Sequence, residues 1–350
     1  MNSSNPSHRP AKIGARTESV SRRNFLKYGT LACAPLIFDW RLDAAARADL
    51  KPVKFGLCAD PHKDLMHDAD QRLGVFIDAV NRDGSEFILQ LGDFCRPDEK
   101  NREFLKIWER FTGPRYHTLG NHDRDGGFAW QQVLDFWGMA HRYYSFDHGG
   151  WHFVVLDGNE IKPVTPQPGY PHYIGREQIA WLEEDLRKTA APTILFVHQS
   201  LEAEGGVENS AEVRAVLEKA NATAGWRKVG VCLNGHHHVD HQKEINEILY
   251  VQVNSMSYVW LGETYAHVRY SAEIDKAFPA IKYTAPYKDP LYASITLDLR
   301  GTLSIQGVRS EFVGPSPWEL GLKEKEGTVA SKNIIVPRIS DRKLTLAVGS

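Results

Sequence analysis

From residue 53 onward, short apolar runs alternate with segments of helical period, and this alternation restricts the chain to an α/β fold. The runs at 53–59, 87–91 and 193–198 are typical of buried strands. The segment at 143–157 predicts a hairpin that turns at its Gly-Gly pair. One helical face between the first two strands carries Leu73, Phe76, Ile77 and Val80. We therefore expect a mixed sheet whose parallel strands are joined by helices.

The N-terminal residues have a different pattern from the rest of the chain. An arginine pair precedes a short apolar run at 28–38 and small residues suited to cleavage near Ala46 or Ala48. This segment resembles a bacterial twin-arginine signal peptide, which implies export of the folded protein to the periplasm or medium by the twin-arginine machinery. The matching residues are Ser21, Arg22, Arg23, Phe25, Leu26 and Lys27. Because the apolar run is about half a membrane span, we expect no stable membrane anchor.

Charge and cysteine content narrow the class of protein further. Residues 1–48 contain 8 of the 42 Lys and Arg residues and 3 of the 44 Asp and Glu residues, which leaves 34 basic against 41 acidic residues in the remainder. This balance lacks the basic footprint of a nucleic-acid-binding protein. Cys58, Cys95 and Cys232 remain after the signal, and none has CxxC-type spacing. We expect them to be small buried hydrophobic residues.

Side chains that bind metals follow the predicted strands at five places. They are Asp60 and His62, Asp93, Asn121 and His122, His198, and His236 to His238. Because ligands bind beyond the carboxyl ends of strands in α/β sheets, we expect one shared site. Imidazole and carboxylate groups suit Fe, Mn or Zn. Seven or more such ligands exceed the four of a tetrahedral zinc site, which favours two metals bridged by one carboxylate.

Five motifs that contain these residues together resemble the calcineurin-like metallophosphoesterases. The motifs are ADPH (59–62), LGDF (91–94), LGNHD (119–123), FVHQS (196–200) and NGHHH (234–238). The resemblance covers residues from about 53 to 260 and implies a four-layer αββα sandwich of two mixed β-sheets flanked by helices. The predicted domains are a signal peptide at 1–48, a phosphoesterase domain at 49–262 and a partly β C-terminal extension of unknown function at 263–350.

Carried over residue by residue, the resemblance implies two metal sites that share one aspartate. The first metal would be held by Asp60, His62, Asp93 and His238. The second would be held by Asp93, Asn121, His198 and His236. His122 matches the family's histidine that stabilises or protonates the leaving oxygen. Two transition metal ions so placed would make hydroxide available near neutral pH and polarise the phosphoryl oxygens for in-line attack.

The expected function is that of an exported, dinuclear-metal-dependent phosphoric-ester hydrolase with a small-molecule phosphoester substrate. A phosphodiesterase or nucleotide pyrophosphatase is favoured over a phosphomonoesterase, because a terminal dianion would require a basic clamp. Only Arg96 and Arg124 lie near the motifs as candidates for binding the substrate. A non-catalytic metal-binding scaffold with the same fold is the third alternative.

The second motif departs from the family pattern. Many relatives have GDxxD, whose second aspartate orients the catalytic histidine, whereas this chain has Arg96 at that position. Either Asp98 or Asp123 takes over this role, or His122 is used differently. Arg96 itself either contacts the substrate phosphate or forms a surface salt bridge.

Two local predictions concern the last motif and the residues that follow it. In NGHHH, an extended backbone would turn the side chain of His237 away from those of His236 and His238. We therefore expect His237 to be a spacer between two ligands. Tyr258 and Trp260 either line a pocket for a base or other ring, or pack in the core, with core packing favoured.

Overall fold

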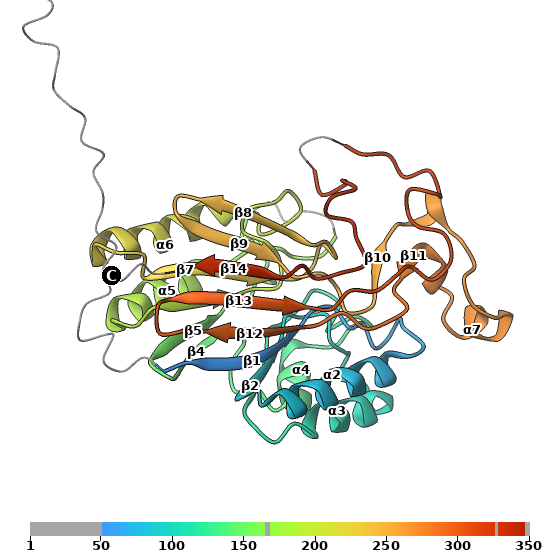
Figure 1. Cartoon of the computed structure of the whole chain (residues 1–350), viewed down its shortest axis with the longest axis horizontal. Helices are drawn as coiled ribbons and strands as arrows, with labels where there is room; N and C mark the ends of the chain where they lie inside the picture. Colours follow the sequence, from blue (N-terminus) through green and yellow to red (C-terminus); the bar gives the residue numbers. More distant parts are fainter. Residues whose placement is uncertain (1–50, 165–168, 326–327, 347–350) are drawn as a thin grey trace, which may run out of the picture. The chain divides into compact units, whose positions relative to one another are not determined.

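The computed structural model describes residues 51–164, 169–325 and 328–346. The twin-arginine signal predicted at 1–48 lies outside these residues. All described residues belong to one compact unit. In this unit two six-stranded sheets pack against each other, and helices cover the outer side of each sheet (Figure 1). The predicted α/β sandwich of two mixed sheets flanked by helices is therefore confirmed.

The first sheet has the strand order β14–β13–β12–β1–β2–β3. β1, β2 and β3 are parallel to one another. The pairs β1–β12, β12–β13 and β13–β14 are antiparallel. The bounds are β1 (Val53–Cys58), β2 (Phe87–Gln90), β3 (Arg115–His117), β12 (Ala293–Leu297), β13 (Thr302–Gly307) and β14 (Arg342–Thr345).

The second sheet has the strand order β4–β5–β6–β7–β9–β8. β4 and β5 form the predicted hairpin, β5, β6, β7 and β9 are parallel, and β8 pairs antiparallel with β9. The bounds are β4 (Tyr144–His148), β5 (Trp151–Val155), β6 (Thr193–Phe196), β7 (Val229–Asn234), β8 (His241–Ile245) and β9 (Ile248–Gln252).

Successive side chains of the central strands enter different layers of the core. In β1, Phe55 and Leu57 pack between the two sheets, while Cys58 packs among the helices of the first sheet. In β7, Leu233 packs between the sheets and Cys232 packs among the helices of the second sheet. Both faces are covered, which explains why these strands are apolar at nearly every position. The three described cysteines are buried and free, as expected.

Helices bury their apolar sides on the outer faces of the sheets. The first sheet is covered by α2 (Ala69–Asp83), α3 (Arg102–Glu109) and α4 (Trp130–Trp137), and the second by α5 (Arg176–Lys188) and α6 (Ser210–Ala224). The apolar face predicted for the first of these helices is buried in α2. Within the described ranges, no helix combines the length and the apolar character needed to cross a membrane.

The residues beyond 262 complete the first sheet. β12 pairs directly with β1, and β13 and β14 follow it outward (Figure 1). Among the described residues, β12, β13 and β14 belong to the same compact unit as the strands before residue 262, and the domain boundary at 262 stays a prediction. Without β12, β1 would be an open sheet edge with unpaired backbone groups, which folded proteins avoid.

A separate two-stranded sheet lies between β9 and β12 in the sequence. It consists of β10 (Tyr258–Trp260) paired antiparallel with β11 (Thr284–Pro286). Short helical segments complete the description. They are η1 (Glu99–Asn101), η2 (Glu263–Tyr265), α7 (Ala272–Ala277) and η3 (Ile281–Tyr283).

A buried ion pair connects the C-terminal residues to the last histidine motif. Asp240 lies two residues after His238, and its carboxylate pairs with the guanidinium of Arg342 at the start of β14. The backbone amide of Asp240 also donates a hydrogen bond of 2.9 Å to the carbonyl of Ile334. The C-terminal segment thus holds the loop that carries His238, although it contributes none of the predicted metal ligands.

Candidate metal centre

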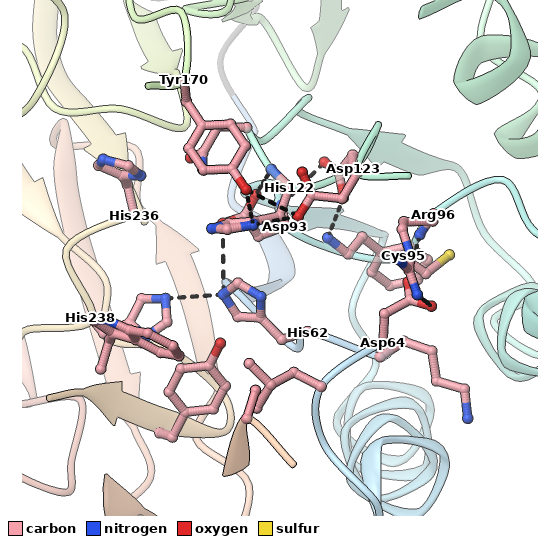
Figure 2. Close-up of a pocket in the computed structure, with 18 residues that line it drawn as sticks. His62, Asp64, Asp93, Cys95, Arg96, His122, Asp123, Tyr170, His236 and His238 are labelled. Atoms are coloured by element: carbon pink, nitrogen blue, oxygen red, sulfur yellow. Dashed lines mark hydrogen bonds and ion pairs between the residues drawn. The ribbon is translucent and has the colours of Figure 1, made fainter. Parts of the chain in front are cut away.

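The loops that follow β1, β2, β3, β6 and β7 carry all the metal-binding side chains predicted from the sequence. Parallel strands of one sheet end at the same edge, and the packing of the two sheets brings both edges together. β1 is followed by Asp60 and His62, β2 by Asp93, β3 by Asn121 and His122, β6 by His198, and β7 by His236 and His238. Figure 2 shows side chains from four of these loops, those after β1, β2, β3 and β7, around one cavity.

Six of these side chains form two groups, each of which is able to hold a metal ion. The first group is Asp60, His62 and His238, and the second is Asp93, His198 and His236. Within each group, the ligand atoms all lie within 4.8 Å of one another. The structure therefore contains two His/Asp triads that are consistent with a dinuclear metal centre.

Asp93 lies between the two triads. Its Oδ2 is 3.5 Å from Nε2 of His62 and 3.3 Å from Nε2 of His198. The amide oxygen of Asn121 lies 3.0 Å from the same nitrogen of His198. The carboxylate of Asp93 is thus placed to be shared by two metals, and Asn121 is placed beside the second triad, as the sequence analysis expects.

The backbone at the predicted ligands is in an uncommon conformation. Seven non-glycine residues among those described have a positive φ, and five of the seven are predicted ligands. These five are Asp60, His62, Asp93, His236 and His238, with φ between 50° and 72°. The left-handed region costs a non-glycine residue about 1 kcal/mol or more. Backbone strain of this kind is concentrated at functional sites, because the surrounding structure must enforce it.

Two motif glycines permit the loops to touch. A Cβ atom on Gly120 would lie 2.1 Å from the backbone nitrogen of Asp93, and one on Gly235 would lie 2.4 Å from Oδ2 of Asp60. Both distances are far shorter than a nonbonded contact permits. The glycines of LGNHD and NGHHH are therefore required by close approach between loops.

The protonation of His62 and His236 suits a metal pair. Nδ1 of His198 donates a hydrogen bond of 2.7 Å to the carbonyl of Leu91, so Nε2, which lies 3.3 Å from Oδ2 of Asp93, is the nitrogen that could bind a metal. Burial lowers the pKa of His198, but the charges of Asp93 and Asp60 outweigh burial and raise it to about 10, so a bound metal would take the place of that proton. Burial holds the pKa values of His62 and His236 well below the ordinary value, so these imidazoles are neutral. Metal binding requires neutral imidazoles and ionised carboxylates. The donor set therefore fits two transition metals of the Fe, Mn or Zn type.

The carboxylate beside His122 is Asp125, and neither Asp98 nor Asp123 has this position. Nδ1 of His122 lies 2.7 Å from Oδ2 of Asp125. The hydroxyl of Tyr170 is 3.1 Å from both of these atoms. Burial lowers the pKa of His122, but the charges of Asp93 and Asp125 outweigh burial and raise it above the ordinary value. Of the alternatives that the sequence left open, neither Asp98 nor Asp123 therefore has the place beside His122.

Asp123 has a structural role instead. Its buried carboxylate accepts hydrogen bonds from the backbone amides of Asp93 (3.1 Å), Phe94 (2.6 Å) and Gly120 (2.6 Å). These bonds join the loops after β2 and β3. Asp98 accepts a hydrogen bond from the backbone amide of Lys100 at η1 and is not among the described residues that line the cavity.

Arg96 forms the ion pair that the sequence left as an alternative. Its guanidinium lies 2.9 Å from the carboxylate of Asp64, which also accepts a 2.8 Å hydrogen bond from the Arg96 backbone amide. Arg96 nevertheless lines the cavity next to the triads (Figure 2). Arg124 is not among the described residues that line this cavity, and its guanidinium lies 5.5 Å from the ring of Trp130.

His237 lies outside both triads, but the expected physical reason was wrong. The segment is not extended, because His236 and His238 have φ of 72° and 53°. Nε2 of His237 instead lies 3.0 Å from the hydroxyl of Ser200. A sharply bent backbone, rather than strand alternation, separates the middle histidine from its neighbours.

The sequence analysis missed two side chains of the cavity. Asp125 lies three residues after His122, a spacing that could have been weighed. Tyr170 comes from a Pro/Gly-rich loop with no periodic signal. Tyr258 and Trp260 both line the cavity, but only Tyr258 is buried. Core packing, which the sequence favoured for both residues, therefore applies to Tyr258 and not to Trp260.

A comparison with protein families matches residues 53–240 to a model described as calcineurin-like phosphoesterase. A 3′,5′-cyclic-nucleotide phosphodiesterase from Nostoc sp. is 24% identical over 157 residues. The match covers 43% of this chain and 53% of that relative, so the chain spans about half the length of the curated relative.

Solved structures share the fold at low sequence identity. A dimetal phosphatase from Danio rerio is 14% identical with a TM-score of 0.52, and the match covers 75% of this chain and 99% of the other. GAP50, the anchor in the inner membrane complex of Plasmodium, is 15% identical with a TM-score of 0.51, covering 85% and 90%. One neighbour is described as a phosphatase and the other as an anchor, so this fold alone does not establish an activity.

We predict that the three adjacent histidines differ in their effect on metal content. His237→Ala should retain about two equivalents of transition metal per chain, whereas His236→Ala or His238→Ala should each lose about one, because each removes a member of a different triad. Elemental analysis of the purified variants measures this. Equal losses of metal in all three variants would contradict the assignment of the triads. Fewer than one equivalent of transition metal per chain in the wild-type protein would contradict the metal centre itself.

Proposed function

We propose that this chain, which belongs to the calcineurin-like phosphoesterase family, is a hydrolase of phosphoric ester bonds. Within this activity, the proposal is an exported phosphodiesterase or nucleotide pyrophosphatase that uses two Fe, Mn or Zn ions. The single observation that favours a diester is the charge of the cavity beside the triads.

Both cationic side chains among the residues that line this cavity are already paired with carboxylates. Nζ of Lys63 lies 2.7 Å from Asp70, and Arg96 lies 2.9 Å from Asp64. A phosphomonoester carries a terminal dianion that gains from an additional basic clamp, whereas a diester phosphate carries a single negative charge. The paired cations therefore favour the diester. The similarity to the Nostoc phosphodiesterase is in line with this preference.

A phosphomonoesterase with the same site is the second candidate. Metals held by the two triads would contact the phosphoryl group in both reactions, so the set of metal ligands does not distinguish a monoesterase from a diesterase. The shared fold of the Danio rerio phosphatase is the observation on its side.

The chain's own residues provide position and charge. A bound metal pair supplies an activated water and polarises a phosphoryl oxygen. Asp60 and Asp93 place carboxylates at the two triads, and the backbone amide of His236 donates to Asp60 at 3.1 Å, which fixes that carboxylate. The backbone amide of His122 likewise donates to Asp93 at 2.8 Å. These hydrogen bonds hold the site in place before a substrate arrives.

His122 is the group we assign to the leaving oxygen. Its Nδ1 is held by Asp125 and Tyr170, so Nε2 is the nitrogen left to act on a substrate. With Asp125 accepting from Nδ1, a protonated imidazole can donate from Nε2 to the departing oxygen. Asp125 and Tyr170 act through His122 and are positioning residues.

The proposal includes export by the twin-arginine route to the periplasm or medium. Its support is the match of Ser21, Arg22, Arg23, Phe25 and Leu26 to the signal pattern. This route carries folded proteins, so the metals would be bound before export.

The substrate preference is tested with a pair of aryl esters. We expect kcat/KM for bis(4-nitrophenyl) phosphate to exceed that for 4-nitrophenyl phosphate by at least about tenfold, because the cavity has no unpaired basic clamp. Release of 4-nitrophenol measures both reactions, with metal content determined on the same sample. A strong preference for the monoester would establish the second candidate instead.

The control for this assay is Asp93→Asn, which removes the carboxylate placed between the triads. Activity on both esters should fall by at least about 100-fold. Nearly intact activity would show that the observed hydrolysis does not come from this site.

Asp125→Asn tests the positioning of His122. The expected loss in kcat is about tenfold for an aryl ester and about 100-fold for an alkyl ester, since an alkoxide leaving group needs protonation more than an acidic phenol does. Asp98→Asn is the matched control, because Asp98 has no contact with His122. Equal losses for the two kinds of ester would mean that Asp125 has only a structural role.

Replacement of the Arg22-Arg23 pair by two lysines tests export. Because the twin-arginine machinery reads the arginine pair, the variant should accumulate in the cytoplasm while the wild-type protein appears in the exported fraction. Immunodetection after cell fractionation measures the distribution. An unchanged exported fraction would contradict the proposed route.

A further inference from the structure

The cavity beside the metal triads is larger than a phosphate group requires. Its volume is about 670 Å³, within the range of pockets that hold whole small molecules. A second cavity of about 500 Å³ adjoins it and shares Lys63, Asp64, Leu65 and Ala280 with it. The site therefore has space for the part of a substrate that is not transferred.

Exposed aromatic side chains are concentrated at this cavity. Seven large hydrophobic side chains are exposed among the described residues, and only Tyr170 and Trp260 are aromatic. Both line the cavity, with exposed fractions of 45% and 52%. An indole is usually buried in a folded protein, so a half-exposed Trp at the wall of a cavity points to a ligand that covers it.

The strand that carries Trp260 explains its direction. Tyr258 and Trp260 are two residues apart on β10, so their side chains lie on the same face of the strand. The Tyr258 ring packs 5.0 Å from the His62 ring and 4.9 Å from the His238 ring. This face of β10 therefore begins at the metal ligands with Tyr258 and continues outward to Trp260.

Trp260 is held in place before any ligand binds. Its backbone pairs with Thr284 of β11, and its ring lies 6.1 Å from the Tyr283 ring in an edge-on arrangement. A ring that is already fixed loses little conformational entropy when a ligand packs on it. Aromatic residues of this kind are suitable platforms for planar groups.

A second aromatic residue reaches the same cavity from a different segment. The Tyr170 ring lies 4.6 Å from the His122 ring, and its hydroxyl contacts Asp125. Its position is therefore fixed by the residues we assign to the leaving oxygen. The cavity thus combines a metal-binding end with aromatic surfaces from β10 and from the loop near 170 (Figure 2).

We propose that Trp260 is a specificity residue that stacks on a nucleobase, so that the substrates are phosphoesters of nucleosides. This inference rests on the proposed function and adds the chemical class of the group beyond the phosphate. Trp260 lies outside the residues matched by the family model, which end at 240, so membership of the family does not imply it. The neutral face of a base also suits a wall that offers an indole and no unpaired charge.

The test compares two ligands that differ only in the base. Adenosine 5′-monophosphate and ribose 5-phosphate are titrated calorimetrically into the metal-loaded full chain, and kcat/KM replaces the Kd for any ligand that is hydrolysed. In the wild-type protein, the nucleotide should bind at least about fivefold more tightly than the sugar phosphate. Trp260→Ala should reduce this ratio to about one, whatever the substitution does to both ligands together, and Trp260→Phe should preserve most of it.

Leu299→Ala is the matched control. Leu299 is 55% exposed and lies two residues after Leu297 at the end of β12. Leu297 pairs with Val53, which lies at the end of β1 opposite Asp60. This variant should leave the ratio of the two affinities unchanged. The metal content of every variant is measured to verify that the site is intact.

Three outcomes would overturn the proposal. One is a wild-type ratio near one, and another is a ratio in Trp260→Ala that equals the wild-type ratio. The third is an alkyl phosphate, such as octyl phosphate, that binds more tightly than ribose 5-phosphate by as much as the nucleotide does. This outcome would mean that the cavity recognises apolar area rather than a ring. Where neither ligand is hydrolysed, calorimetry measures binding alone, so a protein that binds the nucleotide through Trp260 but cleaves no phosphoester would contradict the proposed function and not this inference.

Discussion

The metal centre depends on the buried carboxylate of Asp123, which joins the loops after β2 and β3 through three backbone amides. These hydrogen bonds fix the backbone of Asp93, whose carboxylate must lie between the two triads. Burial and the neighbouring charge of Asp93 raise the pKa of Asp123 well above its ordinary value, against the hydrogen bonds from Gly120 and Phe94, which lower it. The same centre also stores backbone strain at five positive-φ residues. A stable scaffold is needed to maintain these hydrogen bonds and this strain.

That scaffold is the packing of two sheets whose strands end beside one another. β1, β2 and β3 contribute loops from one sheet, and β6 and β7 contribute loops from the other. The C-terminal strands complete the first sheet by pairing with β1, and Arg342 holds the loop of His238 through Asp240. A segment that provides none of the predicted ligands is therefore necessary for the position of one of them.

Sequence reasoning succeeded where the signal was local and failed where it was not. Each ligand lies within four residues of the end of a strand, so its position at the sheet edge could be predicted from neighbours in the chain. His237 was predicted to be a spacer, but on the assumption of an extended backbone, whereas the chain bends sharply at His236 and His238. Asp98 and Asp123 were the partners predicted for His122. The actual partner, Asp125, follows His122 by three residues, and Tyr170 reaches His122 across 48 residues.

The sequence alone determined the α/β class, the strand ends that carry ligands and the types of side chain available for two metals, because these follow from local periodicity and from residue chemistry. Only the tertiary structure decided which carboxylate supports His122, that the cations of the cavity are paired, and that Trp260 is exposed beside the metal triads. Except for His122 and Asp125, which are three residues apart, such contacts join loops that are distant in the sequence, as with Arg96 and Asp64, 32 residues apart, and His62 and His238, 176 residues apart. Their geometry is set by how the two sheets pack, which no single segment encodes.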